Sequence, residues 1–401
     1  MSADGWIDAA EAAERLGVKP ATLYAYVSRG VLTRRRHEDG RRSLFDPTEI
    51  AALRRRGDGE AHGDGLVFAS AITALGPDRP FYRGRDALDL AQSSSYEEVA
   101  EWLWHGRDGV DARPWSSSAA AVAAAQRAQA ALPDDALPLD RLQLIVTTLG
   151  VNDPMRFNVE PDAVAATARS LIAAMVDALP SRSRRKPRLD ASIAERLWPK
   201  LTSASPAAEL LRLLDVALVL LADHELAAST VAARVAASVK ADPYAVVSAA
   251  LGVVGGPMHG GASLGAERMF AQMHSPSDAA RVIGERLRQG ERIPGIGHQV
   301  YKSGDARGTL LFALLSETAP THPRLAVASA ALQELRDRGL PAVNVDFAVA
   351  TFTGVCGMTT GAGEAIFAIA RTAGWVAHAL EEYTRRRPLR PRATYVGPAI
   401  T

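Results

Sequence analysis

Alanine-rich stretches with a helical repeat constrain the fold of this 401-residue chain more than any other feature. They cover residues 114–150 and 155–180, and turn sequences such as ALPDDALPLD and VNDPM interrupt them. The later segment 206–221 is almost wholly apolar, which predicts a helix buried in the body. Ser95 and Glu98 have the spacing of a capping box, which predicts a helix start. Because aromatic residues make up only 6% of the chain, the pattern favours closely packed helices over sheets.

The length and composition indicate a soluble protein with two or three domains. A net charge of +1 gives no overall attraction to nucleic acid or membrane, so such a partner must be inferred from local clusters. The sequence has no apolar run of about 18 residues, and its N-terminus is acidic and poor in apolar residues. We therefore expect a cytoplasmic protein. The single Cys356 excludes an intrachain disulfide and is interpreted as a buried structural thiol.

Two histidines, His259 and His298, each lie inside a glycine-rich stretch, GGPMHGG and GIGHQVYKSGDAR. Glycine has no Cβ, so backbone and ligand can approach closely there. Lys302 and Arg307 follow His298 closely. Arginine can hold a carboxylate with two parallel hydrogen bonds, and lysine can contact a phosphate as a point charge. The region 252–310 therefore predicts a site for a multiply anionic substrate, with the imidazoles directed at its reacting carbonyls.

Two further charged positions are expensive to bury unless they have a function. Asp223, His224 and Glu225 follow the apolar helix. Burying these charged side chains costs free energy, and that cost is easier to understand if His224 faces a ligand. Asp346 lies in the apolar stretch LPAVNVDFAVATF, where loss of hydration makes a carboxylate more basic and suits it to be a general base. A structural aspartate that caps a helix is the alternative. The spacing of Asp223, His224 and His259 does not match a tetrahedral metal site, so we expect no metal.

Residues 6–57 form a separate pattern of two helices with a turn at Gly17, the second helix starting near Pro20. This pattern resembles the helix-turn-helix of MerR-type and excisionase proteins, and RRRHEDGRRS resembles their basic wing, with EDG as its turn. The second helix would enter a major groove, while the wing arginines would contact phosphates. The side chains expected to face DNA are Lys19, Thr22, Tyr24, Tyr26, Arg29, Arg34, Arg35, Arg36, Arg41 and Arg42. Docking on a protein, or on the chain's own body, remains the alternative.

The composition becomes charged and glycine-rich from residue 54, which predicts a linker; we take 1–57 as the helix-turn-helix domain and 58–65 as the linker. Beyond the linker, six stretches resemble citrate synthases. GPMHGGAS is similar to the family's GPLHGGAN, and GIGHQVYKSGDAR to its GFGHRVYKxxDPR. The other stretches, ADHELAAST, NVDF, IARTAGWVAH and RPRATYVG, follow in the family's order, and the resemblance covers residues 66–397.

The resemblance implies an all-α citrate synthase fold with a large domain at 66–263 and 369–401 and a small domain at 264–368. It implies condensation of acetyl-CoA or propionyl-CoA with oxaloacetate and water to give citrate or 2-methylcitrate and CoA. The thioester is then a substrate, and we expect no cofactor. The two acyl groups differ by one methylene, worth only about 1–3 kcal/mol in a pocket, so both stay open. The alternative function is a regulator whose body senses a metabolite while its N-terminal module binds DNA.

The resemblance also assigns roles to individual residues. Asp346 would be the base, His259 would donate to the thioester oxygen, and His298 would donate to the oxaloacetate carbonyl. Oxaloacetate would be held by His224, His298, Arg307, Arg371 and Arg390. Arg390, with Arg392 as second choice, would come from the neighbouring subunit of a homodimer. CoA would be held by Lys302 and by the backbone of Ile293, Pro294, Gly295 and Ile296. Two departures from the family are Leu221, where a histidine is frequent, and Ser263, where asparagine is common.

Overall fold

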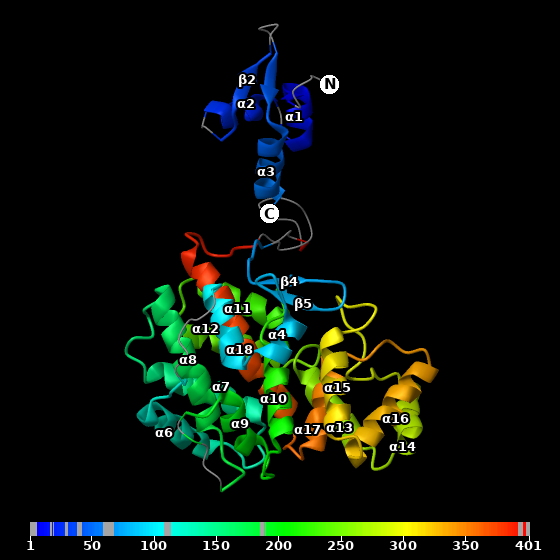
Figure 1. The fold of residues 1–401 in the computed structure, drawn as a ribbon. Coiled ribbons are helices and arrows are strands. Elements are labelled where there is room, and N and C mark those ends of the chain that lie inside the picture. Colours follow the sequence, from blue (N-terminus) through cyan, green and yellow to red (C-terminus); the bar gives the residue numbers. More distant parts are fainter. Residues whose placement is uncertain are drawn as a thin grey trace. The chain divides into compact units, whose positions relative to one another are not determined.

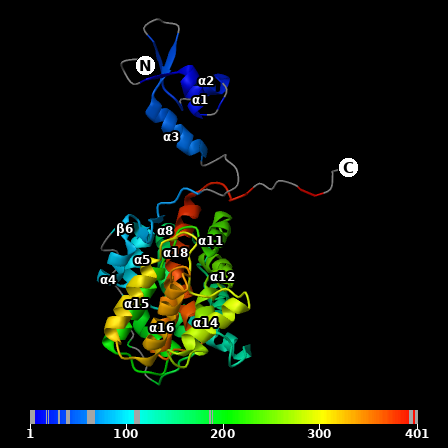
Figure 2. The ribbon, with the colours of Figure 1, turned by 90° about the vertical axis from the view of Figure 1, so that its right-hand side faces the viewer.

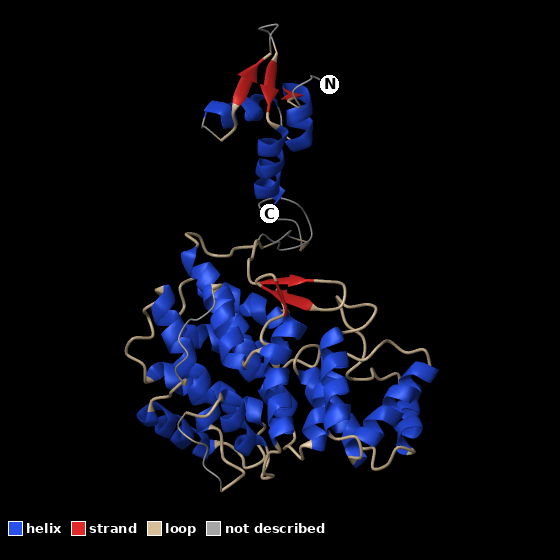
Figure 3. Cartoon of the chain, in the orientation of Figure 1, coloured by secondary structure: helices blue, strands red, loops and turns tan. Residues whose placement is uncertain are grey.

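The computed structural model describes residues 6–16, 18, 20–28, 31–37, 42–58, 68–107, 114–184, 188, 190–391 and 396–397. The chain forms two compact units, one of Met1–Ala69 with Pro391–Thr401 and one of Ser70–Arg390, which we call the body. Helices dominate the body, and strands are few and short (Figures 1 and 3). The predicted all-α class is therefore confirmed.

The N-terminal unit combines short helices with a small antiparallel sheet. Its described elements are β1 (Ile7–Asp8), α1 (Ala9–Leu16), α2 (Pro20–Ser28), β2 (Arg34–Arg36), β3 (Ser43–Phe45) and α3 (Pro47–Asp58). β3 lies between β1 and β2 and pairs with both. The buried apolar side chains that hold the unit together are Ile7, Ala12, Ala13, Leu23, Leu32, Phe45 and Ile50. The two predicted helices and the hairpin strands of the wing are thus confirmed.

Two details of this unit differ from the sequence prediction. α3 continues through Asp58, so the linker predicted from residue 54 begins as helix, because Ile50 and Leu53 pack this helix on the core. Tyr26, expected to face DNA, lies three residues after Leu23 and instead packs against the same core, because core residues of the neighbouring elements cover its side of α2. The predicted turn at 38–40 and four named residues lie outside the described residues: Gly17, Lys19, Arg29 and Arg41.

The body begins with an antiparallel sheet of β4 (Thr73–Leu75), β5 (Pro80–Tyr82) and β6 (Arg85–Asp86), followed by α4 (Ala87–Ser93) and α5 (Tyr96–His105). The predicted capping box at the start of α5 is present. Ser95 Oγ accepts a hydrogen bond from the backbone N–H of Glu98, and the Glu98 carboxylate accepts one from the Ser95 N–H. Two of the N–H groups that a helix start leaves unpaired are thereby satisfied.

The long helix α18 (Ala362–Thr384) runs through the main core, and most of its residues are buried (Figures 1 and 2). The other helices of this core are α6 (Ala119–Ala128), η1 (Gln129–Ala131), α7 (Pro138–Val151), α8 (Pro161–Ala178), α9 (Ile193–Leu201), α10 (Ala208–Leu221), α11 (Ala228–Ser238) and α12 (Pro243–Val254). α5, α7, α8, α10, α11 and α12 all contact α18. None of the described helices has the length and apolar character needed to cross a bilayer.

A second, smaller core lies on the side of the body away from α6 and α8 (Figure 1). Its helices are α13 (Gly261–Ala271), α14 (Asp278–Arg288) and α16 (Pro323–Asp337), while α15 (Ala306–Thr318) and α17 (Val345–Val355) pack against both cores. Its buried members fall between Ala266 and Ala350. The division into large and small domains at the predicted boundaries stays a prediction.

Candidate active site

Three aromatic rings, those of His224, His298 and Tyr301, meet where α10 ends. His224 is buried, and its Nε2 lies 3.0 Å from Tyr301 Oη. The ring centroids of His224 and His298 are 5.1 Å apart, and the rings of His298 and Tyr301 stack at 4.5 Å. Two histidines from separate sequence motifs therefore lie side by side.

Backbone groups determine which nitrogen of His298 carries the proton. Its Nδ1 accepts hydrogen bonds from the N–H groups of Val300 at 3.0 Å and Tyr301 at 3.1 Å. A neutral imidazole has one donor and one acceptor nitrogen, so the proton resides on Nε2. Burial, helped by the nearby charge of Arg307, lowers the pKa of His298 to about 4. At neutral pH His298 is therefore a neutral hydrogen-bond donor.

Arg307, at the start of α15, is buried and paired with Asp305. Its Nε and Nη2 donate to the two Asp305 carboxylate oxygens at 2.9 and 2.8 Å. Burial lowers the pKa of Arg307, but the Asp305 carboxylate outweighs this and raises it above the ordinary value. Asp305 also accepts from the backbone N–H of Val345 at 3.1 Å, which ties α15 to the first turn of α17. The pair fixes one end of the guanidinium group and leaves its remaining N–H groups for a ligand.

Arg371, on α18, is buried with part of its hydrogen-bonding capacity unused. Its Nε donates to the backbone carbonyl of Leu221 at 2.8 Å, whereas its buried Nη1 has no hydrogen-bond partner among the described residues. Burial lowers the pKa of Arg371 to about 10, although the nearby Asp223 opposes the shift, so the group is charged at neutral pH. A buried cation with a free N–H group is suited to an anion that fills the site.

A buried polar network holds Asp223 behind the site. The Asp223 carboxylate lies 3.3 Å from Nε2 of His378, whose Nδ1 is 2.7 Å from Arg234 Nη1. Arg234 Nε in turn donates to Glu382 at 2.7 Å. These four side chains are completely buried, so each depends on the others for its charge or hydrogen bonds. The network places the charge of Asp223 close to Arg371.

His259 precedes α13, as its glycine-rich sequence predicts. The backbone N–H of Ser229 donates to His259 Nε2 at 3.4 Å, and Ser229 Oγ, which accepts from Trp375 Nε1 at 3.2 Å, lies 2.7 Å from the same nitrogen. Nε2 is then an acceptor, and the proton of the neutral ring resides on Nδ1. Burial lowers the pKa of His259 to about 4, with a smaller contribution from Arg371. His259 is therefore a second neutral donor.

Asp346 lies in the first turn of α17. The helix is capped by Asn344, whose Oδ1 accepts from the Asp346 N–H at 3.0 Å, so the capping role considered for Asp346 belongs to Asn344. The Asp346 carboxylate instead accepts a hydrogen bond from Ser263 Oγ on α13. Burial raises the pKa of Asp346 to about 6, against the opposing effects of Ser263 and Arg307. The carboxylate is more basic than an ordinary aspartate and still mostly ionised at neutral pH.

Electrostatic effects connect these groups into one site. Beyond burial, which is the main cause, the charge of Arg371 lowers the pKa of both His224 and His259. The charges of Arg307 and Arg371 also oppose the rise in the pKa of Asp346. The distances agree: the Phe367 ring lies 4.5 Å from the Arg371 guanidinium carbon and 5.6 Å from the His259 ring, so we treat these groups as one site.

Two predicted ligand residues, Arg390 and Lys302, are exposed at the surface. Arg390 is exposed, and the structure shows no hydrogen bond or ion pair for it within the described residues; Arg392 lies outside them. Lys302 is exposed, and its Nζ donates to the His298 carbonyl at 3.3 Å.

The stretch predicted to hold the adenine of CoA, Ile293, Pro294, Gly295 and Ile296, packs against the second core. Ile293 is buried there, and Ile296 forms a β-bridge with Val343. The Gly295 carbonyl accepts from Asn344 N–H at 2.9 Å. The stretch is thereby fixed to the residues that precede Asp346.

Sequence reasoning missed three residues that shape the site, namely Ser229, Tyr301 and Asp305. Tyr301 and Asp305 lie within the predicted motif GIGHQVYKSGDAR, where the histidine and the cations alone were assigned roles. Asp305 precedes Arg307 by two residues, a spacing that could have indicated their pairing. Ser229 lies in ADHELAAST, and only its contact with His259 reveals its role.

Comparison with known proteins shows which families the chain resembles. A family described as "Citrate synthase, C-terminal domain" matches residues 64–392, and a "Helix-turn-helix domain" matches residues 6–58. "Citrate synthase 2" of Bacillus subtilis is 30% identical over 356 residues, which cover 83% of this chain and 94% of that relative. "2-Methylcitrate synthase 2" of Corynebacterium glutamicum is 30% identical over 341 residues, 79% of this chain and 88% of that one.

A solved structure of citrate synthase from Pyrobaculum aerophilum has a TM-score of 0.71 at 26% identity and covers 92% of this chain and 96% of that one. These similarities define an enzyme of the citrate synthase type. The chain belongs to the citrate synthase family and carries a helix-turn-helix domain at its N-terminal side.

Proposed function

We propose that this protein condenses the acyl group of acetyl-CoA or propionyl-CoA with oxaloacetate, giving citrate or 2-methylcitrate and CoA. The proposal rests on one observation: a desolvated carboxylate, Asp346, shares a site with two neutral imidazoles and two buried arginines. Relatives named citrate synthase and 2-methylcitrate synthase support it.

The acceptor half of the site suits a dicarboxylate with a carbonyl between its charges. Arg371, with its unused Nη1, and the free N–H groups of Arg307 would bind the two carboxylates of oxaloacetate. His224 would hydrogen-bond the same molecule. The Nε2–H of His298 would polarise the carbonyl and donate to the oxygen as negative charge develops there. Because His298 is neutral, the two nearby guanidinium charges do not repel it.

The donor half supplies the carbon nucleophile. Asp346 would take a proton from the carbon next to the thioester carbonyl; the electrons of that C–H bond form the C=C bond of the enol, and the Nδ1–H of His259 stabilises the thioester oxygen. The enol carbon then bonds to the oxaloacetate carbonyl carbon, the electrons of the C=O π bond move to its oxygen, and this oxygen takes the Nε2 proton of His298, which regains one from the incoming water. Water finally cleaves the thioester and releases CoA.

The direct test is CoA release by the purified protein. With oxaloacetate and either acetyl-CoA or propionyl-CoA, a thiol reagent should detect free CoA at a rate that depends on both substrates. One methylene in an apolar pocket changes kcat/KM by about 10–200-fold, so one acyl-CoA should be clearly preferred. Absence of oxaloacetate-dependent thiol release with both thioesters would refute the proposed reaction.

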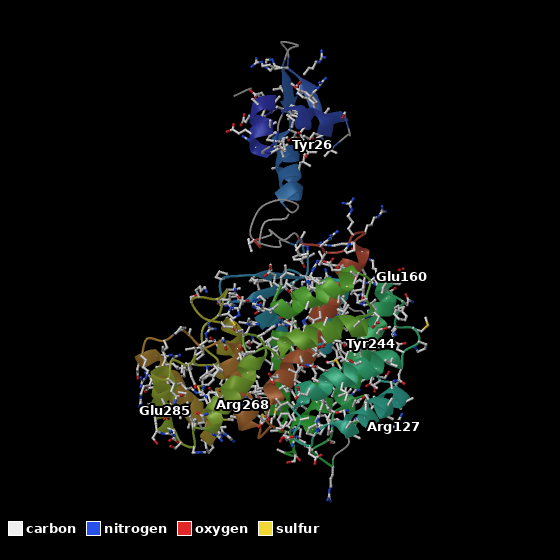
Figure 4. All side chains as sticks on the ribbon, turned by 180° about the vertical axis from the view of Figure 1, so that it is seen from behind. Tyr26, Arg127, Glu160, Tyr244, Arg268 and Glu285 are labelled. Carbon is white, nitrogen blue, oxygen red and sulfur yellow. The ribbon has the colours of Figure 1, made fainter. Side chains whose placement is uncertain are left out.

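We also propose a homodimer in which Arg390 completes the partner's site. Large apolar side chains are exposed on the body, including Met155 at 64%, Phe157 at 68% and Met258 at 84%. Met155 also lines a hollow of about 400 Å³ together with Tyr244, the residue of α12 that Figure 4 labels. A second copy would cover such apolar surface. Light scattering should give twice the 42.6 kDa of the chain, and a monomer active at all concentrations would contradict the proposal.

DNA binding is a second proposed activity, supported by the helix-turn-helix match and by three exposed arginines on β2, Arg34, Arg35 and Arg36. Because arginine–phosphate contacts release counterions, affinity for DNA beside the protein's own gene should fall steeply between about 50 and 200 mM salt. Replacing the three arginines with glutamine should reduce that salt dependence in a gel-shift assay. Binding unaffected by salt or by the substitutions would contradict DNA contact through β2.

A further inference from the structure

Ser263 contacts the carboxylate of Asp346 directly. Its side chain is 1% exposed, and its Oγ donates a hydrogen bond to Asp346 Oδ1. Among the described residues, this hydroxyl is the side-chain donor that the structure shows for the Asp346 carboxylate. In the sequence, Ser263 stands out only because the family commonly has asparagine at this position.

The helices around Ser263 are fixed by a second set of contacts. Glu267, one turn later on α13, accepts hydrogen bonds from the backbone N–H groups of Gly361 at 2.7 Å and Gly363 at 2.8 Å, where α18 begins. A Cβ atom at Gly363 would lie only 3.2 Å from the Ser263 Cβ, so α18 packs tightly on this part of α13. The position of the Ser263 hydroxyl relative to α17 is therefore set by the backbone of three helices.

The charged groups that face Asp346 come from several elements, and some favour its ionised form while others oppose it. Arg307 on α15 and Arg371 on α18 favour the ionised carboxylate, whereas Asp305 and burial oppose it. The Ser263 hydroxyl adds a hydrogen bond that is strongest when the carboxylate is charged. It also occupies Oδ1, so the remaining oxygen, Oδ2, is left to take a proton.

We propose that Ser263 is a positioning residue for the base: its hydroxyl holds Oδ1 of the Asp346 carboxylate and leaves Oδ2 to accept the proton. This inference rests on the proposed condensation, in which Asp346 removes a proton from the acyl carbon. Without the hydroxyl, desolvation raises the pKa of the carboxylate further, and a larger fraction is protonated and inactive at neutral pH and below.

The test is the pH dependence of kcat in Ser263→Ala. The acid limb, which reflects protonation of Asp346, should move up by about one pH unit, so that kcat falls about fivefold at pH 6 and is nearly unchanged at pH 8.5. Ser263→Thr retains the hydroxyl and should restore the limb. Thr353→Val is the matched control, because it removes a buried hydroxyl of α17 that bonds Ala350 and Glu267 instead of Asp346. An unshifted limb in Ser263→Ala, or an equal loss at every pH, would overturn the inference.

A stability measurement separates this inference from the proposed reaction. At pH 8, Ser263→Ala should lower the urea midpoint, and the shift should be only about half as large in an Asp346→Ala background, because the two side chains interact. If this coupling is found but the unmodified protein releases no CoA, the hydrogen bond is supported and the proposed reaction is rejected. Equal shifts in both backgrounds would reject the role of Ser263 even in an active enzyme.

Discussion

Replacing Asp346 with asparagine should lower kcat for condensation by about a thousandfold, since a general base contributes about 10²–10⁴-fold and the amide cannot accept the proton. The asparagine oxygen can still accept the hydrogen bond from Ser263, and Asn344 still caps α17, so the fold should be retained. Steady-state assays across pH 6–9 measure the effect. The residual activity should lack the acid limb that the pKa of Asp346, about 6, gives the unmodified enzyme.

Oxaloacetate binding serves as the control for Asp346→Asn. Calorimetry should give an affinity within about threefold of the unmodified protein, because the proposed dicarboxylate ligands are Arg307, Arg371 and the neighbouring imidazoles. An unchanged kcat would show that Asp346 is not the base. A protein that binds oxaloacetate and DNA but never releases CoA would support the regulator alternative.

Arg371→Gln should weaken oxaloacetate binding by about 100- to 1000-fold. Truncating one partner of a buried charge pair costs about 2–5 kcal/mol, and the glutamine cannot supply the Nη1 that lacks a protein partner. The loss should appear in the Kd from calorimetry and in KM. Arg371→Lys keeps the charge but lacks the planar guanidinium group. Its affinity for oxaloacetate should therefore lie between that of the unmodified protein and that of Arg371→Gln.

The matched control is Arg336→Gln, because Arg336 is an exposed arginine on α16. It should leave Kd and KM unchanged. Urea unfolding of both variants checks the fold, since Arg371 also donates to the Leu221 carbonyl. Equal oxaloacetate affinity in Arg371→Gln and the unmodified protein, with both folded, would remove Arg371 from the site.

The sequence motifs predicted which residues lie at the candidate site better than they predicted the contacts between them. Glycine-rich stretches around His259 and His298 and an aspartate in an apolar run are local signals, and the structure places all three groups around the two arginines. Which side chains form hydrogen bonds with each other is not determined by the local sequence. That Ser263 bonds Asp346 depends on how α13, α17 and α18 pack, and no pattern of spacing within one helix contains that information.

The N-terminal unit shows the same limit on a smaller scale. Helical spacing predicted Leu23 in the core, but the partial burial of Tyr26 depends on the neighbouring elements, whose position the periodicity of α2 does not contain. Residues 54–58 looked like linker because of their charge and glycine, yet packing of Ile50 and Leu53 carries the helix through them. Tertiary contacts override local propensity at both places.

The position of α18 in the chain has a consequence for synthesis. This helix supplies Arg371 to the site, and its backbone carbonyls at Ile369 and Ala373 accept hydrogen bonds from Tyr96 and Trp104, more than 250 residues earlier. A nascent chain that has left the ribosome only as far as α17 therefore lacks the helix against which α5, α7, α8, α10, α11 and α12 pack. We therefore expect that the main core and the candidate site are completed only after α18 has been translated.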